Sequence, residues 1–187
     1  MQSLSKFMLE KVMGWKVVNR FPTELKKYII IVAPHTSWVD FPVGVFVNYS
    51  EKLGANYIAK HTLFKPPFGF MFKALGGTPV DRSKSESRVE AIIKIFNESE
   101  RFVLTLSPEG TRKAVSKWKT GFYFVAKGAK IPIVMCAFNY EKKEVVVSEP
   151  YTITGDEKAD FEHFHHFFKH MKGKKRDQFN PDFHLNL

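Results

Sequence analysis

Cysteine and long apolar runs are the scarcest features of this sequence. The only cysteine among the 187 residues is Cys136, so an internal disulfide framework and a zinc site built from paired cysteines are both excluded. Cys136 lies in an apolar stretch, which indicates core packing rather than a nucleophile. No stretch approaches the roughly 20 apolar residues that span a bilayer, and no secretory signal is visible. These absences favour a cytoplasmic protein.

Negative charge is also in short supply. There are 19 acidic residues against 29 lysines and arginines, and the formal net charge is +10. Such an excess predicts an anionic partner, and nucleic acid, an acidic phospholipid surface and a phosphorylated small substrate all satisfy it. Three histidines, His163, His166 and His170, share one stretch near the C-terminus but lack the carboxylate of a metal motif such as H-E-x-x-H, so we predict no metal site.

The apolar pattern indicates one α/β domain covering residues 1–187. Hydrophobic content is 44% with 19 phenylalanines, and there is no internal repeat, low-complexity tract or evident linker. Apolar runs predict strands, and helical periodicity predicts helices between them. The expected strands are 28–32, 56–59, 78–83, 102–106, 131–138 and 145–147. The expected helices are 41–49, 68–75, 85–99, 121–127 and 156–172. Alternating strands and helices predict a mostly parallel or mixed sheet covered by helices, followed by an irregular tail at 173–187.

Residues 1–20 have the pattern of an amphipathic helix. The apolar positions that would share one face are Leu4, Phe7, Met8, Val12 and Trp15. Two interpretations are equally favoured: a helix packed on the domain, and a helix lying in a membrane interface with its lysines at headgroup level.

A histidine and an aspartate flank the end of the first buried strand. His35 should lie in the loop that leaves strand 28–32, and Asp40 should lie at the start of the next helix. On one continuous helix this spacing would separate the side chains, but a strand–turn–helix junction can bring them together. A histidine whose Nδ1–H is held by a carboxylate presents Nε2 as a base that can deprotonate a hydroxyl.

Further charged residues follow other strands at the same expected edge of the sheet. Lys60, Arg82 and Arg112 are each suited to bind a phosphate, and open α/β sheets bind ligands at the carboxyl ends of their strands. Arg112 belongs to a polar turn in which Glu109, Gly110 and Thr111 could support the site, with backbone N–H groups holding an oxyanion.

The order of these residues resembles the glycerophospholipid acyltransferase family, whose best-known members acylate lysophosphatidic acid. The resemblance runs from about residue 35 to 135 and rests on four blocks. These are His35-x4-Asp40, Lys60-x2-Leu63-Phe64 with Gly77-x-Pro79-Val80-Asp81-Arg82, Pro108-Glu109-Gly110-Thr111-Arg112, and Ile131-Pro132-Ile133-Val134.

The resemblance implies His35 as general base, Asp40 as its partner and a basic phosphate pocket formed by Lys60, Arg82 and Arg112. It also implies a lysophospholipid acceptor, with 1-acylglycerol-3-phosphate favoured, and an acyl thioester donor on coenzyme A or acyl carrier protein. No bound cofactor is expected. The chain departs from the family pattern at Met135 and Ser107, which affects the expected acceptor and chain-length preference rather than the reaction class.

Three alternatives accompany this reading. The acceptor could be a different lysolipid, or the same dyad could act on water as a thioesterase or lysophospholipase. A basic nucleic-acid-binding module is disfavoured because the phenylalanines follow core periodicities instead of forming an aromatic platform. The expected location is the inner face of the cytoplasmic membrane, as a peripheral protein on an anionic surface.

Overall fold

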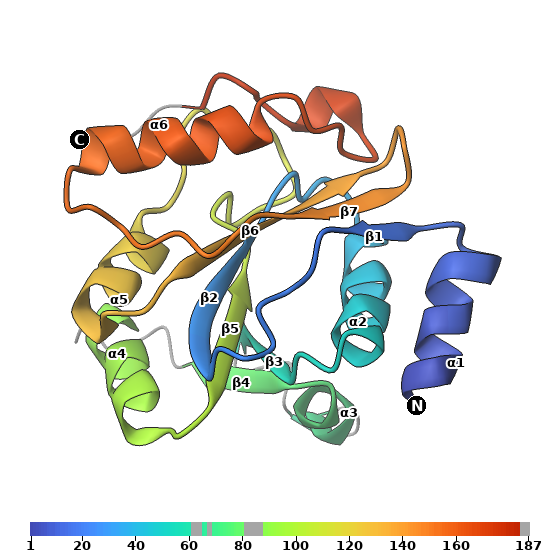
Figure 1. Cartoon of the computed structure of the whole chain (residues 1–187), viewed down its shortest axis with the longest axis horizontal. Coiled ribbons are helices and arrows are strands. Elements are labelled where there is room, and N and C mark those ends of the chain that lie inside the picture. The colour runs from blue at the N-terminus through green and yellow to red at the C-terminus, as the bar shows by residue number, and fades with distance from the viewer. Residues whose placement is uncertain (61–64, 67–68, 81–87, 184–187) are drawn as a thin grey trace.

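The computed structural model describes residues 1–60, 65–66, 69–80 and 88–183, and it is organised around one seven-stranded sheet (Figure 1). The strands are β1 (Lys16–Val18), β2 (Lys27–Val32), β3 (Ala55–Lys60), β4 (Gly77–Val80), β5 (Phe102–Leu106), β6 (Ile133–Asn139) and β7 (Glu144–Val147). The helices are α1 (Gln2–Phe7), the π-helical turn η1 (Met8–Val12), α2 (Asp40–Ser50), α3 (Gly69–Ala74), α4 (Arg88–Glu98), α5 (Gly121–Ala129), α6 (Glu157–Phe168) and the 3₁₀ turn η3 (Arg176–Gln178).

The strand order β1-β7-β6-β2-β5-β3-β4 places β2 at the centre of the sheet. Every neighbouring pair is parallel except β6 and β7. The middle of β2 is flanked on both sides, since Ile30 lies opposite Thr105 of β5 and Val134 of β6. Because parallel strands end at one edge, the chain leaves β2, β5 and β6 at the same side of the molecule.

Helices cover both faces of the sheet and create two apolar layers (Figure 1). On one face Ile29 and Ile31 of β2 pack with aromatic residues of α4, α5 and α6. On the other face Tyr28 and Ile30 pack with residues of η1 and α2. This alternation follows from the two-residue period of a strand, and it confirms the predicted mixed α/β sheet covered by helices.

The N-terminal segment differs from the helix predicted for residues 1–20. The helical turns end at Val12, Gly14 adopts a φ of 74°, and the chain continues as β1, which pairs with β7. Glycine tolerates this left-handed backbone, and β1 with its two valines then extends the sheet. The predicted apolar face is therefore divided: Leu4, Phe7 and Val12 are exposed, Met8 is half-buried, and Trp15 lies in the core.

Residues 173–183 of the tail contain the 3₁₀ turn η3 and pack closely on the domain, and residues 184–187 lie outside the described residues. Phe183 stacks on Trp118 with ring centroids 3.7 Å apart, and the backbone N–H of Lys175 donates to the Thr36 hydroxyl at 3.2 Å. The tail thus contacts the loop that follows β2. Within the described ranges, no helix is both long and apolar enough to cross a membrane.

Candidate functional site

The loop between β2 and α2 brings His35 and Asp40 together. His35 Nδ1 lies 3.0 Å from Asp40 Oδ2, and the two side chains are 31% and 2% exposed. Asp40 is the first residue of α2, where the helix dipole favours a negative charge. With Nδ1 directed to the carboxylate, Nε2 carries the lone pair that can accept a proton. The predicted contact is therefore present in the fold.

Asp40 also holds the backbone of the loop. Its Oδ2 accepts N–H groups from Thr36 at 3.0 Å and from Ser37 at 2.9 Å. These bonds wrap residues 35–37 around one carboxylate oxygen, so the position of the histidine is set by the same group that orients its ring. The bonds to main-chain donors also offset the cost of burying the charge.

Glu109 fixes the loop from the other side. Its Oε2 accepts the backbone N–H of His35 at 2.6 Å and the hydroxyl of Ser107 at 3.3 Å. The side chain is buried, and this burial raises its pKa to about 7 although the two hydrogen bonds act in the opposite direction. The sequence analysis predicted a supporting role for Glu109, and in the structure its carboxylate holds the backbone N–H of His35 by a hydrogen bond.

The turn after Glu109 is exposed and cationic. Gly110 has a φ of 64°, and a Cβ at this position would lie 2.5 Å from Nζ of Lys119. Its N–H donates to the carbonyl of Ser107 at 3.2 Å, so here this group closes a turn. The Thr111 hydroxyl accepts the N–H of Lys113 at 3.3 Å. The oxyanion role suggested for Gly110 and Thr111 stays a prediction.

The phosphate-binding residues can be placed only in part. Arg112 is exposed in the turn beside the His35 loop, and it is joined there by Lys119, which the sequence analysis did not single out. Lys60 ends β3 at the same edge of the sheet, but its side chain lies outside the described residues. Arg82 lies outside them altogether. The phosphate pocket therefore stays a prediction.

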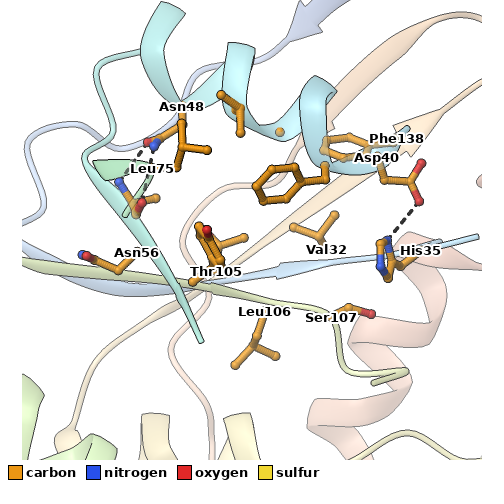
Figure 2. A pocket seen from close by; sticks show the side chains of 15 residues that line it. Val32, His35, Asp40, Asn48, Asn56, Leu75, Thr105, Leu106, Ser107 and Phe138 are labelled. Atoms are coloured by element: carbon orange, nitrogen blue, oxygen red, sulfur yellow. Dashed lines mark hydrogen bonds and ion pairs between the residues drawn. The ribbon is translucent and has the colours of Figure 1, made fainter. Parts of the chain in front are cut away.

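A cavity of about 240 Å³ opens beside the dyad. Figure 2 shows the side chains that line it. His35 and Ser107 lie at one end, and Asn48, Asn56 and Leu75 lie at the other. Most of the wall between them is apolar and comes from β2, α2, β5 and β6. The apolar lining residues are Val32, Phe41, Gly44, Val45, Ala55, Leu75, Leu106 and Phe138. An apolar chain could occupy this space with its reactive end at His35.

Tyr140 is a site residue that the sequence analysis missed. It follows β6, and its hydroxyl donates to Asp40 Oδ1 at 2.5 Å. No motif marks this tyrosine, because its position depends on β6 lying next to β2 in the sheet. The order of the strands is the signal that could have revealed it.

Within the described ranges no group of three histidine, cysteine or acidic side chains is arranged to hold a metal ion. The chemistry that the described site offers is that of a histidine base held by a carboxylate, beside an apolar cavity and a cationic turn.

Comparison with known proteins gives three findings. A family described as Acyltransferase matches residues 14–139, which include the dyad and the cationic turn. A Caenorhabditis elegans protein with the provisional name 1-acyl-sn-glycerol-3-phosphate acyltransferase acl-1 is 27% identical over 148 residues. That match covers 73% of this chain and 55% of the relative, so the chain spans about half the length of the curated relative.

The third finding concerns the fold. The crystal structure of the 1-acyl-sn-glycerophosphate (LPA) acyltransferase PlsC from Thermotoga maritima superposes with a TM-score of 0.58 at 20% sequence identity. The match covers 90% of this chain and 75% of that chain. Most of the sheet and its covering helices are therefore arranged alike in the two proteins.

Proposed function

Because the chain belongs to the acyltransferase family, we propose that it transfers a fatty acyl group from a thioester to the hydroxyl of a lysophospholipid. The favoured acceptor is 1-acylglycerol-3-phosphate, and the product is then phosphatidic acid. The observation that carries this proposal is the His35–Asp40 pair at one end of an apolar cavity. The name of the C. elegans relative supports the same acceptor.

In the proposed mechanism His35 Nε2 takes the proton from the acceptor hydroxyl as its oxygen attacks the thioester carbonyl. Asp40 keeps the imidazole in the required tautomer and stabilises the imidazolium that forms. The tetrahedral intermediate collapses with cleavage of the carbon–sulfur bond, and the imidazolium returns the proton to the departing thiolate. All atoms balance without an acyl-enzyme, so no serine or cysteine nucleophile is required.

The remaining parts of the substrates are assigned by chemistry. The apolar cavity suits a fatty acyl chain, and Arg112, Lys60 and Arg82 are proposed to bind the acceptor phosphate. The thiol carrier, coenzyme A or acyl carrier protein, would approach from solvent at the exposed, cationic turn. An acceptor panel that includes an uncharged lysolipid tests the phosphate assignment, because a phosphate pocket predicts weak use of the uncharged acceptor.

The acyltransferase proposal is tested with His35→Ala and Asp40→Asn, using a labelled acyl thioester and 1-acylglycerol-3-phosphate. A positioned general base contributes about 10²–10⁴-fold in rate, so His35→Ala should lose at least that much. Asp40→Asn should be severely impaired because the tautomer and the imidazolium lose support. His166→Ala, which removes a histidine on α6, is the control and should keep full activity. A His35→Ala protein that retains most of its turnover would contradict the mechanism.

The same assay separates the transferase from a hydrolase. A thioesterase or lysophospholipase that uses the dyad on water would accumulate free fatty acid whether or not acceptor is present. An acyltransferase accumulates acylated lipid, and only when acceptor is added. Equal release of fatty acid with and without acceptor would favour the hydrolase.

We also propose that the protein works as a peripheral protein on the inner face of the cytoplasmic membrane. Its proposed acceptor and product are lipids, and α1 exposes Leu4 at 66%, Phe7 at 56% and neighbouring Val12 at 59% of their surfaces. Near the dyad, Trp38 is 70% exposed. Exposed apolar side chains beside lysines suit an anionic lipid surface.

A further inference from the structure

Tyr140 contacts the proposed catalytic pair through the oxygen of Asp40 that does not face His35. We propose that Tyr140 is a positioning residue that fixes the Asp40 carboxylate and moderates its attraction for the His35 imidazolium. This proposal rests on the proposed function and adds to it a residue just beyond the family match, which ends at residue 139.

The hydrogen bonds of Asp40 show why one hydroxyl matters. Oδ2 accepts hydrogen bonds from the His35 ring and from the backbone N–H groups of Thr36 and Ser37. Oδ1 receives the Tyr140 hydroxyl at 2.5 Å, and among the described residues this is the one hydrogen bond made to Oδ1. The carboxylate is 2% exposed, so bulk water is excluded from replacing the hydroxyl. Loss of the hydroxyl would leave a buried, charged oxygen without a donor.

Tyr140 is itself held by three separate segments. Its ring meets Trp15 edge to face with centroids 4.8 Å apart, and Trp15 also packs against Phe138 at 6.1 Å. Its backbone N–H donates to the carbonyl of Lys172 at 2.8 Å. Burial, together with the bond to Asp40, raises the pKa of Tyr140 well above its usual range. The phenol therefore stays protonated and acts as a donor at any working pH.

The physical effect on the dyad follows from charge. A hydrogen bond donated to Oδ1 draws negative charge away from the carboxylate and weakens its attraction for the imidazolium. Without the hydroxyl, the imidazolium would be stabilised more strongly and the carboxylate would be free to turn.

The other charged and titratable neighbours of this histidine stay in place when the hydroxyl is removed. Glu109, from the loop after β5, reaches His35 through its backbone N–H. Lys175, from the tail, reaches Thr36 through its own backbone N–H. Glu109 also acts on His35 through its charge, but it is present in the wild type and in the Tyr140 variant alike, so the difference between their two titrations is assigned to the Tyr140 hydroxyl.

The experiment uses Tyr140→Phe in the full chain, which keeps the ring against Trp15 and removes only the hydroxyl. The pH dependence of kcat and kcat/KM is measured with acyl thioester and 1-acylglycerol-3-phosphate, and the His35 imidazole is titrated by NMR. We expect the acid limb of the pH–rate profile and the midpoint of the NMR titration both to move to higher pH, by roughly 0.5–1 pH unit. We expect plateau kcat to fall about 10-fold with little change in KM.

Tyr151→Phe is the matched control. The Tyr151 hydroxyl donates at 2.7 Å to Asp160, a fully buried carboxylate in the first turn of α6 that also accepts hydrogen bonds from Tyr123 and Thr154. Removal of this hydroxyl should lower the unfolding temperature and leave the pH profile and the His35 titration at wild-type values. The control thus shows how far the loss of a buried tyrosine–aspartate hydrogen bond changes the activity and the His35 titration when it acts only through lower stability.

A second measurement keeps the test decisive if Tyr140→Phe does not fold. Replacement of all six tyrosines by 3-fluorotyrosine makes each phenol a stronger donor, so the His35 titration should move to lower pH. The same labelling of a folded Tyr140→Phe protein should produce no such displacement. Wild-type titration in the fluorinated protein, or in a folded Tyr140→Phe protein, would overturn the proposal. The NMR titration needs no turnover, so it still reports on Tyr140 if the acyl-transfer assignment itself fails.

Discussion

At the scale of single residues, the site depends on two buried carboxylates with different tasks. Asp40 accepts from the imidazole and the loop, and Glu109 accepts the backbone N–H of His35. The two differ in how many donors they face. Asp40 has four, whereas Glu109 has two and its pKa is raised to about 7 by burial. Glu109 therefore makes folding sensitive to pH near neutrality.

The sign of that dependence is set by the raised pKa. Below about pH 4.5, the ordinary value of the group, Glu109 is protonated whether or not the chain is folded, and it contributes no pH dependence. Between pH 4.5 and 7 the unfolded chain releases the proton while the folded chain keeps it, so stability falls as pH rises. Above pH 7 Glu109 is charged in both states, and the free energy of unfolding is then lower than below pH 4.5 by on the order of 3 kcal/mol.

We therefore predict that Glu109→Gln reduces the loss of stability between pH 5 and pH 8. The amide oxygen can still accept the His35 N–H, and no charge is buried at the higher pH. The measurement is the free energy of unfolding in urea at both pH values, compared with wild type. Glu149→Gln, an exposed carboxylate, is the control and should follow wild type. A Glu109→Gln protein with the wild-type difference between the two pH values would contradict the raised pKa.

At the scale of elements, the junction of β2 and α2 was predictable and the N-terminal segment was not. The apolar run 28–32 and the helical pattern after it fix where the chain turns, so the contact of His35 with Asp40 could be expected. Residues 16–18 are too short a run to indicate a strand, and β1 exists only because β7 offers an edge. Trp15 then joins the core instead of an exposed face.

Tyr140 and the cavity could not be predicted for the same reason. Each depends on which strands are neighbours, and that order is set by long-range pairing rather than by local pattern. Gly44 is an example of what the sequence could not predict. No sequence pattern gives this helical glycine a role, yet in the fold it lines the cavity beside Phe138. A Cβ at this position would lie 3.7 Å from the Phe138 ring, an ordinary contact.

Gly44→Leu is predicted to shorten the acyl chain that the protein prefers. The new side chain fits the helix and fills the apolar cavity, and each displaced methylene costs about 0.8 kcal/mol of binding. The measurement is kcat/KM for a series of acyl thioesters of increasing length. Activity should fall most for the longest donors and least for the shortest.

Gly121→Leu is the control for that series. Its new side chain would start in α5, where a Cβ meets no atom within 4 Å. It should leave the order of preference unchanged. A uniform loss across all donors in Gly44→Leu would show that the cavity does not hold the acyl chain.

At the scale of the whole molecule, the exposed side of α1 is the candidate for contact with lipid. α1 packs on α2 and has Ser5 as its buried residue, and Gln2 ties the two helices together because its amide donates to the Ser50 carbonyl at 3.1 Å. Leu4 and Phe7 lie on the surface instead. The helix is therefore packed on the domain and also presents apolar side chains outward, and the second interpretation, a helix in a membrane interface, stays a prediction.

Phe7→Glu is predicted to weaken binding to anionic vesicles. A fully inserted phenylalanine contributes about 1.5–3 kcal/mol, and each lysine near an anionic surface adds about 1 kcal/mol. Co-sedimentation with anionic and neutral vesicles, at low and high salt, measures the effect. The wild-type protein should bind anionic vesicles, and less of it should bind at high salt than at low salt. Phe7→Glu should bind these vesicles more weakly than wild type at both salt concentrations.

Asn97→Glu is the matched control because it makes the same charge change at an exposed position on α4. Equal binding by wild type and both variants would show that α1 does not contact lipid. Trp15→Glu is not informative here, since Trp15 is 4% exposed and its replacement would disrupt the core.

The parallel pairing of β1 with β7 has a consequence for synthesis on the ribosome. The Asn19 side chain bonds to the carbonyl of Val147 at 2.9 Å, and the two residues are 128 positions apart. Because translation proceeds from the N-terminus, β1 must wait until β7 has emerged before it can join the sheet. Trp15 likewise lacks its partners Phe138 and Tyr140 until residues 138–140, just ahead of β7, have been made. The nascent chain therefore carries an uncovered apolar segment around Trp15 until β7 completes the sheet, and chaperones or lipid could bind this segment in the meantime.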